Sequence, residues 1–453
     1  MKTIAQISTP LGSGGVSVIR MSGKNSLNIA RQIFCSKNLK DDVVPRHMYY
    51  GTINYNGFTE RCLMVYFKAP FSYTGEDVIE FQCHGGELLT TQILNACLQN
   101  GAVLAENGEF TKLAFVNGKI SLDEAESVID MINATSDAEL KATNQIVRGE
   151  LFKTISSLQQ KIKDALVNLE VAIDYPEHDD EALGVEHLTK TLLNVKQVLS
   201  SLKDTAKNGL IIKSGINVAI VGKPNVGKSS LLNALLGEDR AIVTSVKGTT
   251  RDTLKETINY KGIKINFIDT AGIHDSEDEV EKIGINRSVK SLNDAHLVLA
   301  LFDLSENFEQ EDYNILDLCK QKKAIIVLNK SDIKNDNNIK SIIIKKLYKD
   351  CKIIEVSAKN NINIDLIKQE ILNCTISQKI DFSSIIITNT RHLEAINLAL
   401  SQIENVLKEC KYQTLDILDM LTKEIWQTLG RITGQTENED IISGIFKKFC
   451  LGK

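Results

Sequence analysis

The chain lacks three features that would point to a membrane or to secretion: a long apolar run, a signal-like start and paired cysteines. No stretch of about 18 apolar residues is present to span a bilayer, and no charged segment followed by an apolar one opens the sequence. The 9 cysteines form no Cys-x-x-Cys pair and no Cys/His cluster, which predicts free, mostly buried thiols in a reducing compartment. We therefore expect a soluble cytoplasmic protein whose first residues, Thr3 to Ser8, form a strand and leave no room for a transit peptide.

The chain also lacks a strong charge of either sign. Its formal net charge of -5 gives no global attraction to nucleic acid, so a nucleic-acid partner must be met by a local basic patch or through an associated subunit. Disorder is not expected either, because a hydrophobic content of 43% and a charged content of 25% are ordinary globular values. The length of 453 residues is too great for one core, and a prior of one domain per ~150 residues suggests about three domains.

One glycine-rich stretch carries the clearest chemistry. Residues 222–229, Gly-Lys-Pro-Asn-Val-Gly-Lys-Ser, fit the spacing GxxxxGK[ST], in which backbone N–H groups surround phosphates, the lysine neutralises phosphate charge and the hydroxyl holds Mg²⁺. The apolar run Ile216 to Val221 precedes it as a predicted buried strand, and Ser229 to Leu236 follows with helical spacing. A structural glycine turn is the alternative, but the strand and the helix on its two sides favour a phosphate-binding loop.

The domain organisation follows from changes in the hydrophobic pattern. Residues 1–118 carry short β-branched and aromatic runs bounded by turn residues, which predict a small N-terminal α+β domain. Residues 119–214 and 379–453 carry apolar residues at helical spacing, and the first of these segments begins with a capping box of Ser121 and Glu124. Each of these segments is predicted to be helical, and the first needs partner helices from elsewhere in the chain.

Residues 215–378 alternate apolar strands with helical patterns, as in a doubly wound, mostly parallel sheet. Because both flanks are helical, we expect this domain to be inserted into a helical domain built from two chain segments, an arrangement that costs little when the ends of the insert lie close together. The predicted fold class is multidomain α/β plus all-α. The predicted strands of the inserted domain are Ile216 to Val221, Ile263 to Ile268, His296 to Phe302, Ala324 to Leu328 and Ile353 to Val356.

Three further motifs, each after a predicted strand, indicate that the nucleotide carries guanine. Asp269 to Gly272 (DTAG) supplies a carboxylate that reaches Mg²⁺ through water and a glycine N–H for the γ-phosphate. Asn329 to Asp332 (NKSD) supplies a carboxylate that can accept both the N1–H and the N2 amino group of guanine, a donor pair that adenine lacks. Ser357 to Lys359 (SAK) supplies a backbone N–H for guanine O6. Each motif is weak by itself, but their order and placement together predict a GTP site.

These residues match the translation-factor-related GTPases, in which Gly248 to Asp252 looks like the first switch and Thr250 resembles the Mg²⁺-binding threonine. Ile273 follows the DTAG motif, where Ras-like proteins place a glutamine that orients water. An aliphatic side chain cannot orient water, so hydrolysis needs another group or a cation.

The combination resembles the MnmE (TrmE) family of tRNA modification GTPases over essentially the full length. Family members usually end Cys-Ile-Gly-Lys, so Leu451 is a mild departure. Besides the GTPase motifs, the resemblance rests on Gly75 to Glu80 (GEDVIE), His84 to Gly86 (HGG), Phe115 to Lys119 (FVNGK), Asp278 to Gly284 (DEVEKIG) and the tail Phe449 to Lys453 (FCLGK). It implies a folate-binding-like N-terminal domain and a Ras-like P-loop GTPase domain.

The resemblance implies roles for the nucleotide-site residues. Glu281 matches the catalytic glutamate that orients water, and Lys228 is the phosphate-loop lysine; Ser229 and Thr250 would hold Mg²⁺. The family often has Arg two residues after the switch glycine, where this chain has His274. The expected K⁺ ligands are Asn225, Thr244, Val246 and Thr249. The expected GTP-binding residues are Asn225, Val226, Gly227, Lys228, Ser229, Ser230, Thr244, Ser245, Val246, Lys247, Gly248, Thr249, Thr250, Asp269, Thr270, Ala271, Gly272, Asn329, Lys330, Asp332, Ser357, Ala358 and Lys359.

The resemblance also implies a site for a tetrahydrofolate derivative, either 5-formyl or 5,10-methylene, as one-carbon donor. Its expected residues are Arg20, Glu80, Lys119 and Lys453, where the carboxylate suits the N–H pair of a pterin and the cations suit a glutamate tail. Taken from the residues alone, each of these is more often an ordinary surface charge. Cys450 resembles the family's tail cysteine and is either a functional thiol or a small buried apolar residue.

The function that the resemblance implies is modification of C5 of the wobble uridine, position 34, of certain tRNAs to the aminomethyl or carboxymethylaminomethyl form. The chain would act as a homodimer whose G domains approach each other in K⁺, in a heterotetramer with an FAD-dependent partner of the MnmG (GidA) type. One alternative is a ribosome-assembly or signalling GTPase, although such proteins usually carry a basic RNA-binding module after the G domain. A second is a folate-dependent aminomethyltransferase with an accessory GTPase, which would keep its turnover when Lys228 is changed.

Overall fold

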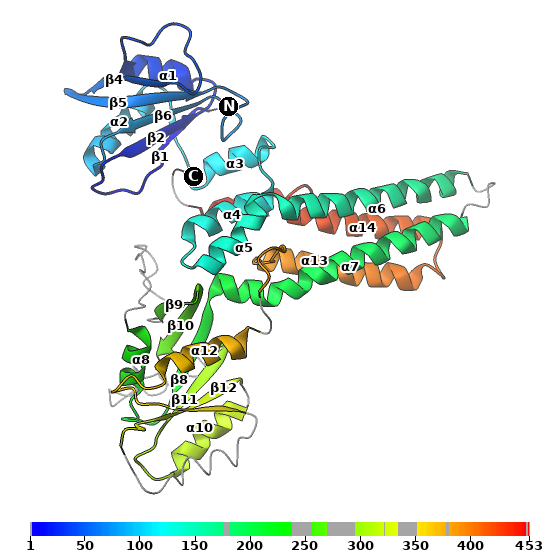
Figure 1. The fold of residues 1–453 in the computed structure, drawn as a ribbon. Helices are drawn as coiled ribbons and strands as arrows, with labels where there is room; N and C mark the ends of the chain where they lie inside the picture. The colour runs from blue at the N-terminus through cyan, green and yellow to red at the C-terminus, as the bar shows by residue number, and fades with distance from the viewer. Residues whose placement is uncertain are drawn as a thin grey trace, which may run out of the picture. The chain divides into compact units, whose positions relative to one another are not determined.

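The computed structural model describes eight stretches of the chain, and Figure 1 shows their helices and strands. These stretches are residues 2–175, 181–237, 255–269, 295–320, 322–333, 351–376, 380–449 and 452. The chain divides into two compact units, each assembled from separate stretches of sequence. The first comprises Met1–Ile132, Asn144–Leu199 and Glu394–Lys453, and the second comprises Asn133–Thr143 and Ser200–Leu393.

The N-terminal part of the first unit is a sheet with helices packed on it. Within the described residues the strand order is β3-β4-β5-β6-β2-β1-β7, antiparallel except for the parallel pairing of β1 with β7. Alternation along β2 buries Ile19 and Met21 against the helices and turns Arg20 to the other face. The elements are β1 (Ile4–Ile7), β2 (Ser17–Ser22), α1 (Ser26–Ile33), β3 (Phe34–Cys35), β4 (Met48–Tyr55), β5 (Phe58–Phe67), β6 (Val78–Cys83), α2 (Glu87–Gln99) and β7 (Val103–Leu104).

The helical part of the first unit combines helices from before and after the inserted domain, which confirms the predicted two-segment construction. In Figure 1, α6 and α14 lie side by side, and Gln159 of α6 donates a hydrogen bond of 3.1 Å to the carbonyl of Trp426 in α14. Residues Leu151, Ile155, Leu158 and Ile162 of α6 are buried at helical spacing. The helices that follow α2 are α3 (Glu109–Val116), α4 (Leu122–Asn133), α5 (Asp137–Val147), α6 (Glu150–Asp174), α7 (Glu181–Ser214), α13 (Thr390–Glu409), α14 (Leu415–Thr433) and α15 (Glu439–Phe446). Most of α5 belongs to the second unit, and α7 and α13 each have residues in both units.

The capping box predicted at the start of α4 is present. Glu124 accepts hydrogen bonds from the backbone N–H and the hydroxyl of Ser121, at 2.6 Å and 2.9 Å. The apolar face predicted for this helix is only partly buried, because Leu122 and Ala125 are buried while Ile132 is 45% exposed. The helix therefore packs through its first turns.

The second unit holds the predicted doubly wound sheet, in the order β13-β12-β11-β8-β10-β9 among the described strands. All neighbouring pairs are parallel except β9 with β10. The hairpin strand β9 was not predicted, because its sequence Lys-Glu-Thr-Ile-Asn-Tyr is mostly polar and reads as surface. The elements are β8 (Ile216–Val221), α8 (Lys228–Leu236), β9 (Lys255–Tyr260), β10 (Ile263–Asp269), β11 (Leu297–Asp303), α10 (Gln310–Lys320), β12 (Ala324–Asn329), β13 (Lys352–Glu355) and α12 (Ile364–Thr375).

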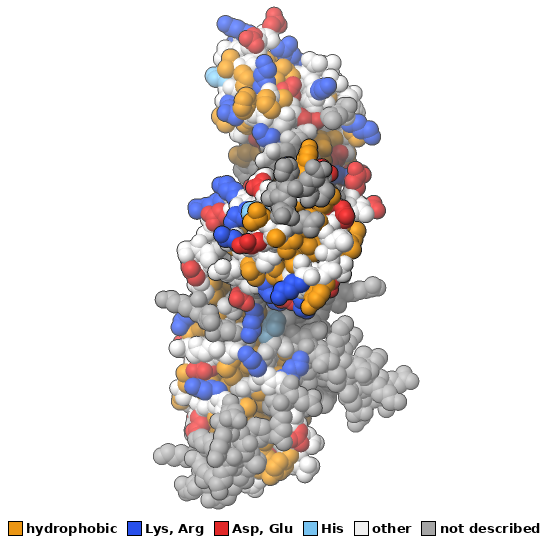
Figure 2. Space-filling view, turned by 90° about the vertical axis from the view of Figure 1, so that its right-hand side faces the viewer, with side chains coloured by type: hydrophobic (Ala, Val, Ile, Leu, Met, Phe, Trp, Pro, Cys, Tyr) orange, Lys and Arg blue, Asp and Glu red, His pale blue; other side chains and the backbone are white. Residues whose placement is uncertain are grey.

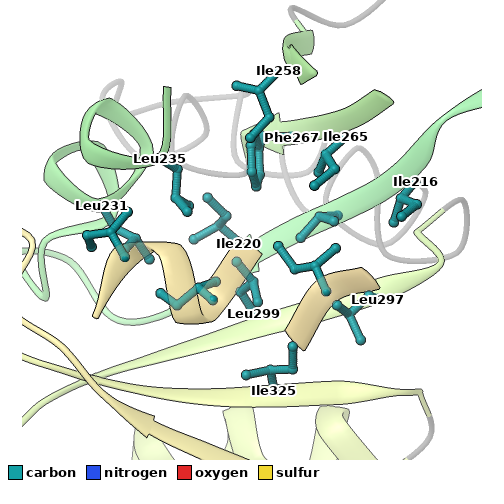
Figure 3. Close-up of a cluster of buried hydrophobic side chains, with 14 of the residues drawn as sticks. Ile216, Ile220, Leu231, Leu235, Ile258, Ile265, Phe267, Leu297, Leu299 and Ile325 are labelled. Atoms are coloured by element: carbon teal, nitrogen blue, oxygen red, sulfur yellow. The ribbon is translucent and has the colours of Figure 1, made fainter. Parts of the chain in front are cut away.

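Helices cover both faces of this sheet. Figure 3 shows the core on one face, where Leu231 and Leu235 of α8 belong to the same buried cluster as Ile220, Phe267 and Leu299 of the strands. On the other face, α10 contributes Leu316 to a separate cluster with residues of β11 and β12. The carboxyl ends of β8, β11, β12 and β13 therefore meet at one edge, which is where open α/β sheets bind ligands.

The cysteines are less buried than the sequence predicts. All the described cysteines are free, and burial raises the pKa of both Cys62 and Cys97 to about 12, so these two thiols stay protonated at neutral pH. The prediction of mostly buried thiols is wrong for the described part of the chain: Cys62, Cys83 and Cys97 are buried, Cys351, Cys374 and Cys410 are half-buried, and Cys35 is exposed. None of the described helices is long and apolar enough to cross a membrane.

Candidate functional site

The phosphate loop connects β8 to α8 in a backbone conformation that its sequence explains. Gly227 has a φ of 96°, and Asn225, a residue type that tolerates the left-handed region, has a φ of 61°. A Cβ added to Gly227 would lie 2.4 Å from Nδ2 of Asn329, so no other residue fits there without displacing that side chain. Gly227 immediately precedes α8, whose free N–H groups and helix dipole suit an anion.

Lys228 lies over this loop. Its Nζ donates hydrogen bonds to the carbonyl of Gly222 at 2.8 Å and to the carbonyl of Lys223 at 2.9 Å, and the side chain is half-buried. The two serines that follow, Ser229 and Ser230, are exposed in the first turn of α8. An ammonium held on the loop and an exposed hydroxyl beside it fit the phosphate-binding and Mg²⁺-binding roles that the sequence predicts.

The amide of Asn329 joins the phosphate loop to both guanine motifs. Its Nδ2 donates to the carbonyl of Val226 at 2.9 Å, and its Oδ1 accepts the N–H of Ala358 at 3.0 Å. The side chain is buried with 2% exposure, so both hydrogen bonds are shielded from water. The structure thus brings together three segments that the sequence places far apart.

The other guanine-motif residues form a second contact at the same edge. The hydroxyl of Ser357 donates to Oδ1 of Asp332 at 2.5 Å, and this bond lowers the pKa of the Asp332 carboxyl below its ordinary value. In the Ser357 to Lys359 motif, the N–H of Ala358 already donates to Asn329. The N–H of Lys359 has no acceptor in the described part of the chain, so it remains available to a ligand. An ionised carboxylate and a free N–H are the groups that the edge of guanine requires.

Asp303 is a functional residue that the sequence reasoning missed. It ends β11 with a fully buried side chain and forms an ion pair with Lys330 of the NKSD motif. Burial alone would raise the pKa of the Asp303 carboxyl, but hydrogen bonds from Lys330 and Ser305 lower it below the ordinary value. An aspartate that ends an otherwise apolar strand is the sequence signal that could have identified it.

A second cluster lies on the N-terminal sheet. Nε of Arg20 is 2.8 Å from Oε1 of Glu80, its cross-strand neighbour, and the guanidinium lies 5.8 Å and 5.7 Å from the ring centres of Tyr73 and Phe110. In the described part of the chain Oε2 of Glu80 has no donor, so one carboxylate oxygen remains for a ligand. The sequence reasoning also missed both aromatic residues: Phe110 is fully buried beside Arg20, whereas Tyr73 is 37% exposed and offers an apolar surface to a ring system such as a pterin.

Lys119 is held at the loop that carries Tyr73. Its Nζ donates to the carbonyl of Pro70 at 3.0 Å, and its stem lies beside Gly75. The tail also lies against the N-terminal sheet. Gly452 is so close to Ile7 of β1 that an added Cβ would lie 2.3 Å from the Ile7 carbonyl oxygen. Arg20 and Glu80 are therefore in contact, and Lys119 is joined to them through the Tyr73 loop.

Many predicted site residues lie outside the described residues. Only the backbone of Asp269 is described, at the end of β10. The predicted residues outside the described part of the chain are Thr244, Ser245, Val246, Lys247, Gly248, Thr249, Thr250, Thr270, Ala271, Gly272, Glu281, Cys450 and Lys453, together with Ile273, His274 and Leu451.

Two protein-family models match this chain, one over the N-terminal sheet and one over the rest of the chain. The family model described as "GTP-binding protein TrmE N-terminus" matches residues 3–119, and the one described as "MnmE helical domain" matches residues 122–450. The tRNA modification GTPase MnmE of Clostridioides difficile (strain 630) is 41% identical over 100% of this chain and 99% of its own length. The chain belongs to the MnmE family of tRNA modification GTPases.

Another MnmE relative, from Finegoldia magna, is also 41% identical, over 99% of this chain and 99% of its own length. Among solved structures, that of Era from Aquifex aeolicus is 31% identical over 41% of this chain and 66% of that chain, with a TM-score of 0.30. The MnmE helical-domain match spans the inserted domain as well as both helical segments. The N-terminal match contains Arg20 and Glu80, and the helical-domain match contains the phosphate loop and the guanine motifs.

Proposed function

We propose that the chain binds and hydrolyses GTP at the sheet edge where β8, β11, β12 and β13 end. The observation that carries the proposal is the buried Asn329 amide, which connects the phosphate loop with both guanine motifs. The phosphates then lie at Lys228 and the start of α8. The Asp332 carboxylate accepts hydrogen bonds from guanine, and the N–H of Lys359 donates one to guanine. Adenine offers no donor pair to the Asp332 carboxylate, so GTP is the expected nucleotide.

Hydrolysis requires a metal and a means of orienting water. We assign Mg²⁺ to the hydroxyls of Ser229 and Thr250; when bound, it supplies positive charge for the outer phosphates. Ser229 fits this role because its side chain is exposed beside the phosphate loop. Glu281 is assigned the orientation of the attacking water, which Ile273 cannot perform.

A monovalent cation is the expected activator. K⁺ bound beside the phosphates supplies the charge that an arginine finger supplies in other GTPases. Asn225 suits a cation because its amide oxygen is available on an exposed side chain within the loop. The proposed K⁺ ligands are Asn225, Thr244, Val246 and Thr249.

The N-terminal cluster is proposed to hold a tetrahydrofolate derivative, 5-formyl or 5,10-methylene, as one-carbon donor. Glu80 would accept the N–H pair of the pterin, and Lys119 and Lys453 would neutralise the glutamate tail. The exposed ring of Tyr73 beside Arg20 supports the binding of a flat ring here. With an FAD-dependent partner of the MnmG (GidA) type, the chain would then modify C5 of uridine 34 in certain tRNAs to the aminomethyl or carboxymethylaminomethyl form.

The tRNA modification is assigned to a cytoplasmic homodimer of this chain, which joins the FAD-dependent partner in a heterotetramer. We assign residues 1–118 to folate binding and dimerisation, 119–214 and 379–453 to the helical domain, and 215–378 to the GTPase domain, with Cys450 as a functional thiol of the tail. Figure 2 shows acidic and basic side chains interspersed on one face, with neither sign forming a continuous field. Because the net charge of -5 gives no global attraction to nucleic acid, direct contact with tRNA is assigned to local groups or to the partner.

The proposal is tested with the purified full chain. We expect hydrolysis of GTP and not of ATP, and binding of 5-formyltetrahydrofolate in calorimetry that the Glu80→Gln variant loses. The matched control is Glu106→Gln, which changes an exposed glutamate of the same domain and should bind the folate normally. GTP hydrolysis without folate binding would favour the ribosome-assembly or signalling alternative, and equal hydrolysis of ATP would refute the guanine assignment.

A further inference from the structure

Lys223, the second residue of the phosphate loop, has an almost fully buried side chain. Its exposed fraction is 6%, and its Nζ lies 2.8 Å from Oε2 of Glu309 and 3.1 Å from Oδ2 of Asp312. A buried ammonium is costly unless it is paired and hydrogen-bonded, so these two acids fix the position of the side chain. The GxxxxGK[ST] pattern allows any residue at this position, and no part of the proposed function uses it.

The acids that hold Lys223 are themselves fixed to the start of α10. Asp312 is 1% exposed, and its Oδ2 accepts the N–H of Glu309 at 2.9 Å, while its own N–H donates to the carbonyl of Glu309 at 3.0 Å. This is a closed turn at a helix N-terminus, in which the carboxylate accepts the backbone N–H of Glu309. The loop is therefore tied to a helix start.

The backbone of Lys223 also holds the phosphate-binding lysine. Its carbonyl and that of Gly222 accept the Nζ of Lys228. A displacement of residues 222 and 223 would consequently move the ammonium of Lys228 as well as the N–H groups around the phosphates. Since catalytic and binding groups lose much of their effect when misplaced by about 1 Å, the tether has a consequence for binding.

The connection between β11 and α10 carries a second ion pair at its other end, with a fully buried carboxylate and a half-buried lysine. Asp303, the last residue of β11, pairs with Lys330. The next residue, Leu304, donates its N–H to the carbonyl of Asn329 at 3.0 Å. One end of this segment therefore contacts the guanine motif, and the other end contacts the phosphate loop.

We propose that the segment Asp303 to Asp312 sets the geometry of the nucleotide site through two lysine–aspartate pairs. Lys223 and Asp312 are positioning residues for the phosphates, and Asp303 is a positioning residue for the base through Lys330. This rests on the proposed GTP site. Lys223 acts indirectly, because its ammonium is bound by Glu309 and Asp312.

The test compares GDP with guanosine, which lacks phosphates, as ligands of the full chain. Lys223→Met alone would leave Asp312 buried without its partner, so the decisive variant is the pair Lys223→Met with Asp312→Asn, whose folding is checked by thermal melting. We expect its Kd for GDP to rise about tenfold or more, the loss of roughly one well-placed contact, with guanosine affinity within about twofold of wild type. Lys223→Arg in the otherwise wild-type chain keeps a cation beside Asp312, and it should bind GDP like wild type.

The reciprocal variant and a matched control complete the test. Asp303→Asn should weaken guanosine and GDP together, because both carry the base. Lys352→Met breaks a lysine–glutamate pair of the same unit, between the exposed Lys352 of β13 and Glu370 of α12, and should change neither affinity. A folded double variant with wild-type GDP affinity would overturn the proposal, as would an equal loss of GDP and guanosine in that variant. Failure of the wild-type chain to bind GDP would instead refute the GTP site.

Discussion

Asn329 holds the nucleotide site together by two hydrogen bonds from one side chain. The bond to Val226 spans 103 positions of sequence and the bond to Ala358 spans 29, yet both are buried. No local pattern reveals such a link; the motif predicts that Asn329 lies near the nucleotide, and only the fold gives its partners.

Replacement of Asn329 by Ala should therefore damage nucleotide binding more than one lost contact would. The carbonyl of Val226 and the N–H of Ala358 would lose their partner, and each buried unpaired group costs about 1–3 kcal/mol. We expect Kd for GDP to rise by roughly 10- to 100-fold in isothermal titration. Asn373→Ala, at an exposed asparagine of α12 in the same unit, serves as the control and should bind normally. Unchanged GDP affinity in Asn329→Ala would contradict the role given to this amide.

Asp332 gives a pH dependence whose sign follows from its lowered pKa. The Ser357 hydroxyl stabilises the carboxylate, so the charged form that guanine needs is present at and above the ordinary pKa and is lost only as pH falls through the lowered one. Guanosine affinity should therefore stay constant from pH 8 down to about pH 5, where a free Asp is still mostly ionised. In Ser357→Ala the decline should begin at a higher pH than in wild type. Titration curves that coincide would contradict this assignment.

At the level of elements, the strand–loop–helix unit β8, residues 222–227 and α8 was predicted closely from sequence. The apolar run identified β8 with its observed bounds, and helical spacing identified α8 within one residue. Local rules suffice here because the loop conformation is dictated by its own glycines. Lys223 and Asp303 were missed for the opposite reason, since a charged residue in a loop or at a strand end reads as surface unless its buried partner is known.

Gly227→Ala tests whether the loop conformation depends on this glycine. A Cβ there would meet Nδ2 of Asn329 and would hold an alanine at a φ of 96°, a strain of order 1–3 kcal/mol before any clash is counted. We expect GDP binding to be lost and thermal stability to fall. Gly444→Ala is the matched control, because that helical glycine has ordinary φ and open space around it, and it should be neutral or slightly stabilising. Equal behaviour of the two variants would refute the strained-loop explanation.

At the level of the whole molecule, the insertion of one domain into another was predictable from the order of patterns alone. The helical segments on both sides of the α/β pattern had no other partner, and α6 with α14 supplies that pairing. The N-terminal cluster was less predictable. Arg20 and Glu80 are ordinary surface charges in sequence, and only antiparallel pairing of β2 with β6 places them in contact.

The proposed K⁺ activation of the dimer predicts a cation-dependent rate. Because Ile273 cannot orient water and Asn225 is assigned to K⁺, GTP hydrolysis should be faster in KCl than in NaCl of equal ionic strength by about tenfold or more, a part of what an arginine finger supplies. Steady-state phosphate release measures this. Glu281→Ala should keep GTP affinity and lose hydrolysis in both salts. Equal rates of the wild-type chain in the two salts would remove K⁺ from the mechanism.

The central claim is that the GTP site and the N-terminal cluster serve one reaction on tRNA. Mass spectrometry of wobble uridines in tRNA from cells lacking this protein tests it most directly, with the wild-type chain and Lys228→Ala supplied in trans. We predict that the aminomethyl or carboxymethylaminomethyl group at C5 of uridine 34 is absent, returns with wild type and does not return with Lys228→Ala. Fully modified wobble uridines in cells without the protein would contradict the account.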